Sequence, residues 1–512
     1  MPKRFGLMLL AFVVILLPHG VVVAAPDLYA AVIPALRDGV MAQTEGELST
    51  YTLDVRFDPA ASTIGGRERL TWVNRFDQPL NDVAFRLYPN AFYYGEGGTT
   101  IEDVRVAGEA ATGSSEVGET VLRVPLTEAV PPGGSVNLSF RFRTVIPTNS
   151  DGTYGIFNHD TATGTWVLAD WYPIVAGYET GTGWRLDEPT ALGDPTFSDA
   201  ALYDVSVDAP AGFSLVATGS AVETSTTVDG TETQFASGPA REFTLVADDD
   251  YQATSTTVDG TTITAYVNPN TGSDAGAALA LETAARALHA YSARYGAYPY
   301  EELDLVETDL SSSVLAVSWT GVIFLEGPNL LANPSFVETD PARLDFTVAH
   351  EVGHQWWGAL IGANSNDHTF MVEGLTNALA TIYVEDTQGK DAARRQIQDE
   401  LADRYLNALE SAGDGIVDLP ITTPRQGPSA GVLDYGKAAL GFLAIREAIG
   451  DDAFFAALSD YAARFSYRNA TPDDLRAAFE RASGQDLTDF WHVWFNAAET
   501  TPADVEQVVA GV

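Results

Sequence analysis

Two histidines and a glutamate in one short segment have the spacing of a hydrolytic metal centre. Residues 349–358 read AHEVGHQWWG, in which His350 and His354 lie four positions apart. On a helix both imidazoles then project from the same face, and two neutral imidazole nitrogens suit a cation such as Zn²⁺. Glu351 lies beside that face and can accept a proton from a metal-bound water without being a ligand. The segment therefore predicts a metal ion that activates water.

A catalytic zinc site needs a third protein ligand and an open coordination position. Glu373 can supply that ligand, because it lies nineteen residues after His354 on the next predicted helix. The alternative is a structural pair of histidines, but the chain has only seven His and two of them form this motif. We therefore predict one Zn²⁺ per chain, held by His350, His354 and Glu373, with Glu351 as the general base.

Helices must carry these residues, and the hydrophobic pattern predicts helices at 343–360 and 370–385. Helical patterns begin near residue 274 and continue toward the end of the chain, interrupted by a loop rich in Gly, Pro and Asp at 412–431. Between residues 49 and 251 short segments alternate apolar and polar residues between turn signals, as half-buried strands do. The sequence thus predicts an α+β multidomain protein, in which an all-β sandwich or saddle precedes the domain with the metal motif.

Composition excludes several classes of partner and chemistry. The chain has 70 acidic against 28 basic residues and a formal net charge of −42. Nucleic acid is excluded as a partner, because phosphate binding needs a basic surface. The chain has no cysteine, so disulfides, zinc–thiolate sites and cysteine nucleophiles are also excluded.

The N-terminus has the layout of a secretory signal peptide. Lys3 and Arg4 precede an unbroken apolar stretch at 5–17, and residues 23–25 are small enough for a signal peptidase to cut after Ala25. We therefore expect export across the cytoplasmic membrane to a secreted, periplasmic or cell-surface location. The alternative is an uncleaved membrane anchor, because residues 21–23 prolong the apolar character.

The segment from His350 to Glu373 resembles the gluzincin signature of the M1 metallopeptidase family, which includes aminopeptidase N and leukotriene A4 hydrolase. Further resemblance lies at residues 85–90, 298–306 and 435–440. The resemblance implies a thermolysin-like α/β catalytic domain after the β domain, a bound zinc ion, and hydrolysis of peptide bonds. It also implies that Tyr435 hydrogen-bonds the oxyanion of the tetrahedral intermediate.

These patterns and the resemblance together divide the chain. The predicted parts are a signal peptide (1–25), a leader segment (26–48), an N-terminal β domain (49–251), a catalytic domain (252–450) and a short helical C-terminal segment (451–512).

The sequence departs from the family in the loop that binds the substrate's α-amino group. Family members have a glutamate there, in a Gly-x-Met-Glu-Asn or Gly-Gly-Met-Glu-Tyr loop. When Gly321 is aligned with the glycine after that loop, Ser318 occupies the glutamate position. A neutral serine cannot pair with an ammonium ion, so another acid must take this role or amine recognition is weakened. The nearest acids in sequence are Glu307, Asp309 and Glu326.

Two other functions remain open at this point. The chain could be a non-catalytic peptide-binding protein on the same scaffold, although such a protein has no physical need for Glu351. It could also hydrolyse a non-peptide substrate such as an epoxide, which the family resemblance permits. Peptides are the expected substrates in the main hypothesis, and the sequence leaves the preferred side chain and the oligomeric state open.

Overall fold

The computed structural model describes residues 27–150, 152–192, 196–310 and 314–511. The predicted signal peptide at 1–25 lies outside these residues. The predicted leader segment contains helix α1 (Pro34–Thr44). Within the described ranges every helix is too short or too polar to cross a lipid bilayer.

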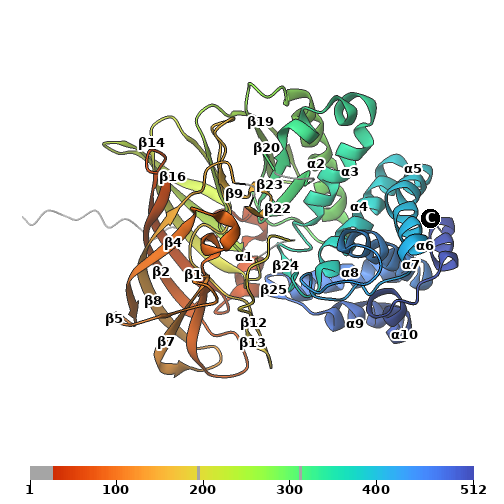
Figure 1. Ribbon diagram of the computed structural model, residues 1–512, viewed down its shortest axis with the longest axis horizontal. Coiled ribbons are helices and arrows are strands. Elements are labelled where there is room, and N and C mark those ends of the chain that lie inside the picture. Colours follow the sequence, from red (N-terminus) through yellow and green to blue (C-terminus); the bar gives the residue numbers. More distant parts are fainter. Residues whose placement is uncertain (1–26, 151, 193–195, 311–313, 512) are drawn as a thin grey trace, which may run out of the picture.

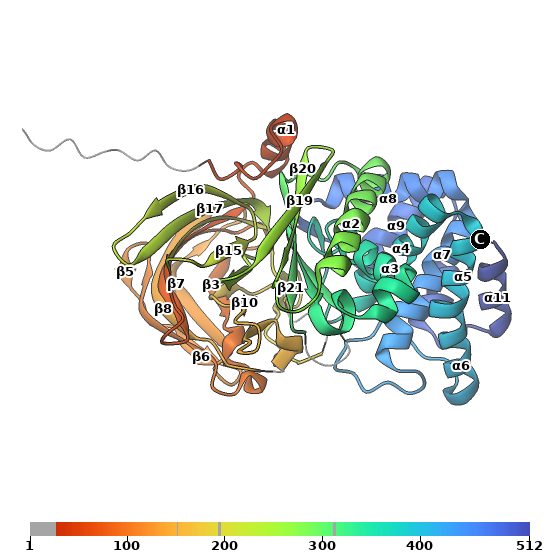
Figure 2. The ribbon, with the colours of Figure 1, turned by 90° about the horizontal axis from the view of Figure 1, so that it is seen from above.

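The N-terminal part of the chain is a layered β structure, as the alternating pattern predicts (Figures 1 and 2). An eight-stranded sheet has the order β16-β17-β14-β1-β2-β8-β4-β5, and two four-stranded sheets have the orders β15-β18-β10-β9 and β11-β3-β7-β6. Strand β1 (Ser49–Asp58) buries Leu53, Val55 and Phe57 on one face and exposes the residues between them. This period of two places an apolar face of the large sheet against the interior.

The strands of this β-rich region (residues 49–251) have the following bounds besides β1: β2 Thr63–Val73, β3 Leu80–Arg86, β4 Gly98–Val106, β5 Glu109–Ala110, β6 Ser114–Glu116, β7 Val121–Val130, β8 Ser135–Val145, β9 Phe157–His159, β10 Trp166–Leu168, β11 Ile174–Val175, β12 Tyr178–Glu179, β13 Gly183–Trp184, β14 Ala201–Pro210, β15 Ser214–Ala217, β16 Ser220–Thr226, β17 Gly230–Ala240 and β18 Leu245–Asp248.

A separate five-stranded sheet begins the second half of the molecule. Its order is β19-β20-β21-β23-β22, with β20, β21 and β23 parallel and β22 antiparallel at the edge. The bounds are β19 Gln252–Val258, β20 Thr261–Val267, β21 Glu302–Thr308, β22 Ala316–Trp319 and β23 Val322–Glu326. The edge strand β22 contacts helix α3, which carries the metal motif.

Helices pack beside this sheet and fill the remainder of the molecule (Figure 2). One hydrophobic cluster joins strand β20 at Ile263 to the last helix at Val508. The bounds are α2 Asp274–Tyr295, α3 Pro341–Gly353, α4 Glu373–Gln388, α5 Lys390–Gln396, α6 Asp403–Ala412, α7 Ala438–Ile449, α8 Asp451–Phe465, α9 Pro472–Ser483, α10 Thr488–Trp491 and α11 Pro502–Gly511, with a short pair β24 Ile361–Gly362 and β25 Arg468–Asn469. The domain boundaries at 251/252 and 450/451 stay predictions.

The largest difference from the sequence prediction concerns the end of the motif helix. The pattern predicts a helix to residue 360, but α3 ends at Gly353 and His354 is its C-cap. Gly358 has a φ of 134°, which a right-handed helix cannot contain. Trp356 and Trp357 are buried in the turn that follows, so their apolar character continues the helical pattern after the helix has ended.

Candidate active site

Helices α3 and α4 bring the three predicted ligands together. The donor atoms of His350, His354 and Glu373 all lie within 4.8 Å of one another. The two Nε2 atoms of the histidines are 2.9 Å apart, and Oε2 of Glu373 lies 3.2 Å from the first and 3.4 Å from the second. Glu373 is the first residue of α4, so its carboxylate lies at the positive end of that helix.

The spacing of these donors fits a tetrahedral zinc ion. Donors that lie 2.0–2.2 Å from such an ion are roughly 3.3–3.6 Å apart, so an outward shift of a few tenths of an ångström suffices. The Nδ1 atom of His354 lies 3.1 Å from the Trp357 carbonyl oxygen. That contact assigns the proton to Nδ1 and leaves Nε2 free to bind a cation.

Glu351 has the surroundings of a general base. Its side chain is buried, and Oε2 has no hydrogen-bond partner among the described residues. Burial raises the pKa of this carboxyl group, while His350 and His354 oppose the rise. A buried oxygen without a partner is costly unless a further group occupies the space beside it. A water molecule bound to a metal between the histidines would be such a group.

Tyr435 lies over the same cluster, on a short helical turn at 432–437. Its ring stacks on the His350 ring, with centroids 6.2 Å apart and an angle of 27° between the planes. The residue as a whole is 38% exposed, whereas its hydroxyl group is enclosed beside the Glu373 carboxylate. Burial, with the Glu373 and Glu351 carboxylates, raises the pKa of its phenol, which keeps the group protonated and able to donate. The turn and the start of α7 pack tightly on α4, because a Cβ at Gly374 would lie 2.8 Å from the Asp434 carbonyl oxygen and 2.5 Å from the Ala438 Cβ.

Ser318 does not direct a free hydroxyl group toward the cleft. Its Oγ donates to the Glu351 carbonyl oxygen (3.1 Å) and accepts from Nε2 of Gln355 (2.8 Å). Gly321 has a φ of 75° at the turn after β22, and its N–H donates to Oε1 of Gln355 (2.9 Å). Gln355, in the turn directly after α3, therefore holds the edge strand β22 against the helix that carries the metal motif (the metal helix). The sequence analysis missed this role because nothing in the motif requires it.

Two of the three acids nearest to Ser318 in sequence, Glu307 and Glu326, make hydrogen bonds away from the histidines. Glu307 accepts from the Asn268 N–H and from the Ser273 hydroxyl. Glu326 accepts hydrogen bonds from Asn329 at the start of the next turn. Neither side chain lines the cavity beside the histidines.

That cavity has a volume of about 650 Å³ and is lined by both halves of the molecule. Besides Glu351 and Glu373, three acids line it. Asp434 pairs with Arg425 (3.0 Å) and Glu400 with Arg404 (2.5 Å). The third, Glu242, comes from the β-rich region and is buried, and its Oε1 accepts from the Thr320 N–H (2.9 Å). The apolar side chains of the wall include Ile156, Phe197, Val317 and Phe346.

Comparison with known proteins agrees with this geometry. Residues 279–494 match the sequence model of the peptidase family M1 domain. Aminopeptidase N of Lactobacillus helveticus is 27% identical over 220 residues, and aminopeptidase M1-A of Oryza sativa subsp. japonica is 24% identical over 231 residues. The alignments cover 42% and 44% of this chain, and they span only 26% of the length of each relative.

Solved structures resemble the chain over most of its length. An M1 zinc metallopeptidase from Deinococcus radiodurans has a TM-score of 0.61 at 18% identity, over 89% of this chain and 95% of its own. A mutant of an M1 zinc metallopeptidase from the same organism has a TM-score of 0.64 at 17% identity, with the same coverage. At these identities the likeness shows the fold, a β-rich region followed by a helical catalytic region. The stretch of this chain that matches the peptidase family M1 domain, residues 279–494, includes the three clustered donors.

Proposed function

We propose that the protein is an exported zinc metallopeptidase that acts as an aminopeptidase. One observation carries the proposal: His350, His354 and Glu373 converge beside the buried Glu351 at the wall of a cavity of about 650 Å³. Similar proteins support it, because the curated relatives are named aminopeptidases and one similar structure is described as bound to a Tyr-Ser-Ala substrate. A cavity of this size accommodates a short peptide.

The residues of the chain divide the chemistry between them. A zinc ion held by the three donors would polarise the substrate carbonyl and lower the pKa of its bound water to about 7. Oε2 of Glu351 takes a proton from the attacking water and transfers it to the leaving amine. The Tyr435 hydroxyl donates to the carbonyl oxygen as negative charge develops there.

Aminopeptidase action requires an acid for the substrate's ammonium group, and Ser318 cannot be that acid. Glu242 is our candidate among the carboxylates of the cavity. The carboxylate of Glu242 accepts a hydrogen bond from the Thr320 N–H, two residues after Ser318. The Ser318 hydroxyl in turn donates to the Glu351 carbonyl oxygen, so this segment connects Glu242 to the general base. No cationic side chain of the described ranges forms an ion pair with Glu242, whereas Asp434 and Glu400 are both paired. Burial raises the pKa of the Glu242 carboxyl group, and Arg241 is close enough to oppose this rise but forms no ion pair with it. A buried carboxylate without a direct cationic partner favours a ligand that brings one.

Mass spectrometry of products from a peptide library, with free and N-acetylated N-termini, tests this function. Aminopeptidase action predicts loss of single N-terminal residues from the free peptides alone. Cleavage inside both sets of peptides would instead indicate an endopeptidase. Bound peptides without any cleavage would favour the alternative of a non-catalytic peptide-binding protein.

Export is the remaining part of the proposal, and residues 1–25 support it by their sequence. Fractionation of the producing cells, with N-terminal sequencing of the mature chain, tests it. A mature chain outside the cytoplasm that begins after Ala25 is the expected result. An intact N-terminus in the soluble cytoplasmic fraction would contradict it.

A further inference from the structure

Arg241 is a buried arginine that the chemistry described above does not use. It follows strand β17 in the β-rich region, and only 6% of it is exposed. Its guanidinium group makes five hydrogen bonds, and no carboxylate of the described ranges forms an ion pair with it. The acceptors are Ala359 O (2.7 Å), Leu360 O (3.2 Å), Arg468 O (2.8 Å), Ser198 O (3.1 Å) and Asn469 Oδ1 (2.7 Å).

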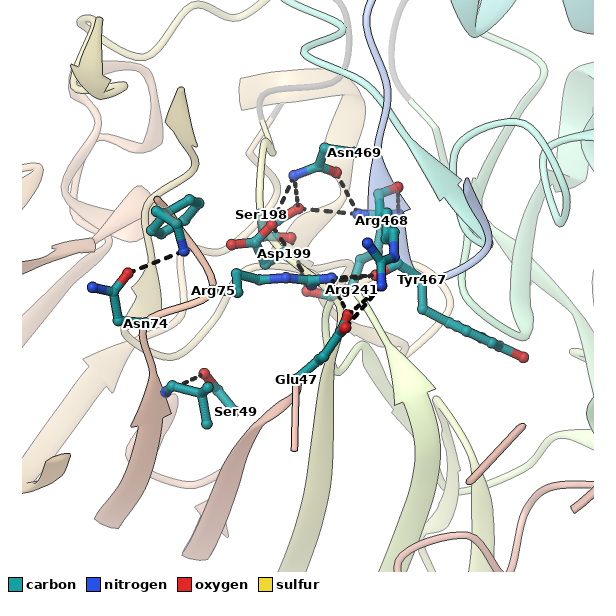
Figure 3. A network of polar contacts seen from close by, with 12 residues as sticks. Glu47, Ser49, Asn74, Arg75, Ser198, Asp199, Arg241, Tyr467, Arg468 and Asn469 are labelled. Atoms are coloured by element: carbon teal, nitrogen blue, oxygen red, sulfur yellow. Dashed lines mark hydrogen bonds and ion pairs between the residues drawn. The ribbon is translucent and has the colours of Figure 1, made fainter. Parts of the chain in front are cut away.

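This arrangement is unusual because a buried cation normally pairs directly with an anion. Burial lowers the pKa of Arg241, and Asp199 and Glu242 only oppose this shift without forming an ion pair with the guanidinium group. Here all five N–H groups are satisfied by neutral oxygens on three separate segments of the chain. One segment precedes β14, another is strand β25, and the third is the turn that follows the metal helix. Figure 3 shows Arg241 among the residues of the first two segments.

The fit around the guanidinium group is close. A Cβ at Gly362 would lie 2.2 Å from Nη1 of Arg241 and 2.2 Å from Oδ1 of Asn469. Gly362 also pairs with Asn469 in the short β24–β25 ladder. Only glycine at position 362 leaves room for the guanidinium group. The turn after the metal helix therefore fits closely against Arg241.

The turn held by Arg241 also orients a predicted zinc ligand. The Trp357 carbonyl oxygen lies 3.1 Å from Nδ1 of His354, and the Ala359 N–H donates to the His354 carbonyl oxygen (3.0 Å). The position of the Trp357 carbonyl therefore depends on a turn whose far end is held by Arg241. Partners of this kind set the tautomer and ring orientation of a ligating histidine.

A second arginine of the β-rich region contacts the residue just before β25 and makes no hydrogen bond to this turn. Arg75 donates to the Tyr467 carbonyl oxygen through both Nη atoms (3.3 and 3.2 Å). It also lies 3.9 Å from Asp199 and 3.7 Å from Glu47 (Figure 3). Arg75 thus shares the docking of β25 with Arg241, but not the contacts with residues 359 and 360.

We propose that Arg241 is a positioning residue of the metal centre: by holding the carbonyls of Ala359 and Leu360, it fixes the turn that orients His354. The inference rests on the proposed zinc site. Arg241 would then connect the β-rich region to the turn that follows the metal helix. The geometry of the predicted ligands should therefore change when the Arg241 side chain is replaced by a shorter one.

The test uses the full chain loaded with Co²⁺, whose visible absorption reports ligand geometry. Arg241→Met is expected to weaken Co²⁺ and Zn²⁺ binding by about tenfold, the lower end of the effect of ligand-orienting groups. It should also alter the Co²⁺ bands. Arg75→Met, the matched control, should leave affinity within twofold and the bands unchanged. Arg241→Lys should fall between, because an ammonium group cannot reach all three segments.

The outcomes separate this inference from the proposed function. A wild-type chain that binds neither metal refutes the zinc site itself. Wild-type affinity and spectrum in a folded Arg241→Met variant overturn the positioning role. If that variant does not fold, Arg241→Lys decides alone, and values equal to those of the wild type overturn the role. Equal losses in Arg75→Met and Arg241→Met overturn it too, because they would indicate a general effect of docking.

Discussion

Replacement of Glu242 by Gln should remove most of the preference for substrates with a free N-terminus. The carboxylate is buried at the cavity wall, with its Oε1 on the Thr320 N–H and no ion pair among the described residues. A hydrogen bond to a charged partner contributes about 1.5–3 kcal/mol. At 1.36 kcal/mol per tenfold change, its loss corresponds to a factor of about 10 to 150.

The assay compares kcat/KM for a short peptide with that for its N-acetylated form. We expect Glu242→Gln to lower the ratio of the two values by that factor, mainly through the free peptide. Glu400→Gln is the matched control, because Glu400 lines the same cavity but pairs with Arg404 at 2.5 Å. An unchanged ratio in Glu242→Gln, or an equal fall in both variants, would refute the reasoning.

Three further perturbations follow from the structure. Tyr435→Phe should lower kcat by a factor of about 10²–10³ with zinc content unchanged, because it removes one hydrogen-bond donor to the developing oxyanion. Stopped-flow kinetics with metal analysis checks this, and an unchanged kcat would exclude the role of Tyr435. Gly374→Ala should destabilise the fold by about 1–3 kcal/mol, because the new Cβ would lie 2.5 Å from the Ala438 Cβ. Denaturant unfolding measures the loss in the free energy of unfolding. Equal stability of the two proteins would show that the neighbouring turn can shift. Glu68→Met should stabilise the fold, and more so at higher pH. Burial raises the pKa of the Glu68 carboxyl, whose oxygens have no partner among the described residues. At a pH above about 4.3, the ordinary pKa of this carboxyl group, unfolding therefore releases a proton. The free energy of unfolding of the wild type then falls as the pH rises from about 4.3 toward the pKa of the folded state. A stability difference that is the same at pH 5 and pH 8 would contradict this.

The convergence of the three donors could be predicted from sequence because the spacing of the histidines is a local property of helices. His350 and His354 share one face whatever surrounds the helix, and Glu373 follows on the next element. The all-β character of the first half was equally accessible, because strands such as β1 alternate apolar and polar residues strictly. Strands β19 and β20 were not predicted, because runs of Thr give little contrast between their faces.

The rest of the site depends on contacts between distant segments. Arg241 and Glu242 follow a strand of the β-rich region, and their sequence context gives no sign that they reach the cavity and the metal helix. The early end of α3 was missed because Trp356 and Trp357 continue its apolar pattern in a turn. Ser318 was aligned with an amine-binding position, yet the structure commits its hydroxyl to Glu351 and Gln355.

The most direct test of the account measures zinc content and peptide hydrolysis together, in the wild type and in Glu351→Gln. Because Glu351 lies beside the three donors without being one of them, we predict one zinc per chain in both proteins and hydrolysis in the wild type alone. Full activity in a wild-type preparation that contains no metal, or in Glu351→Gln, would contradict the central claim.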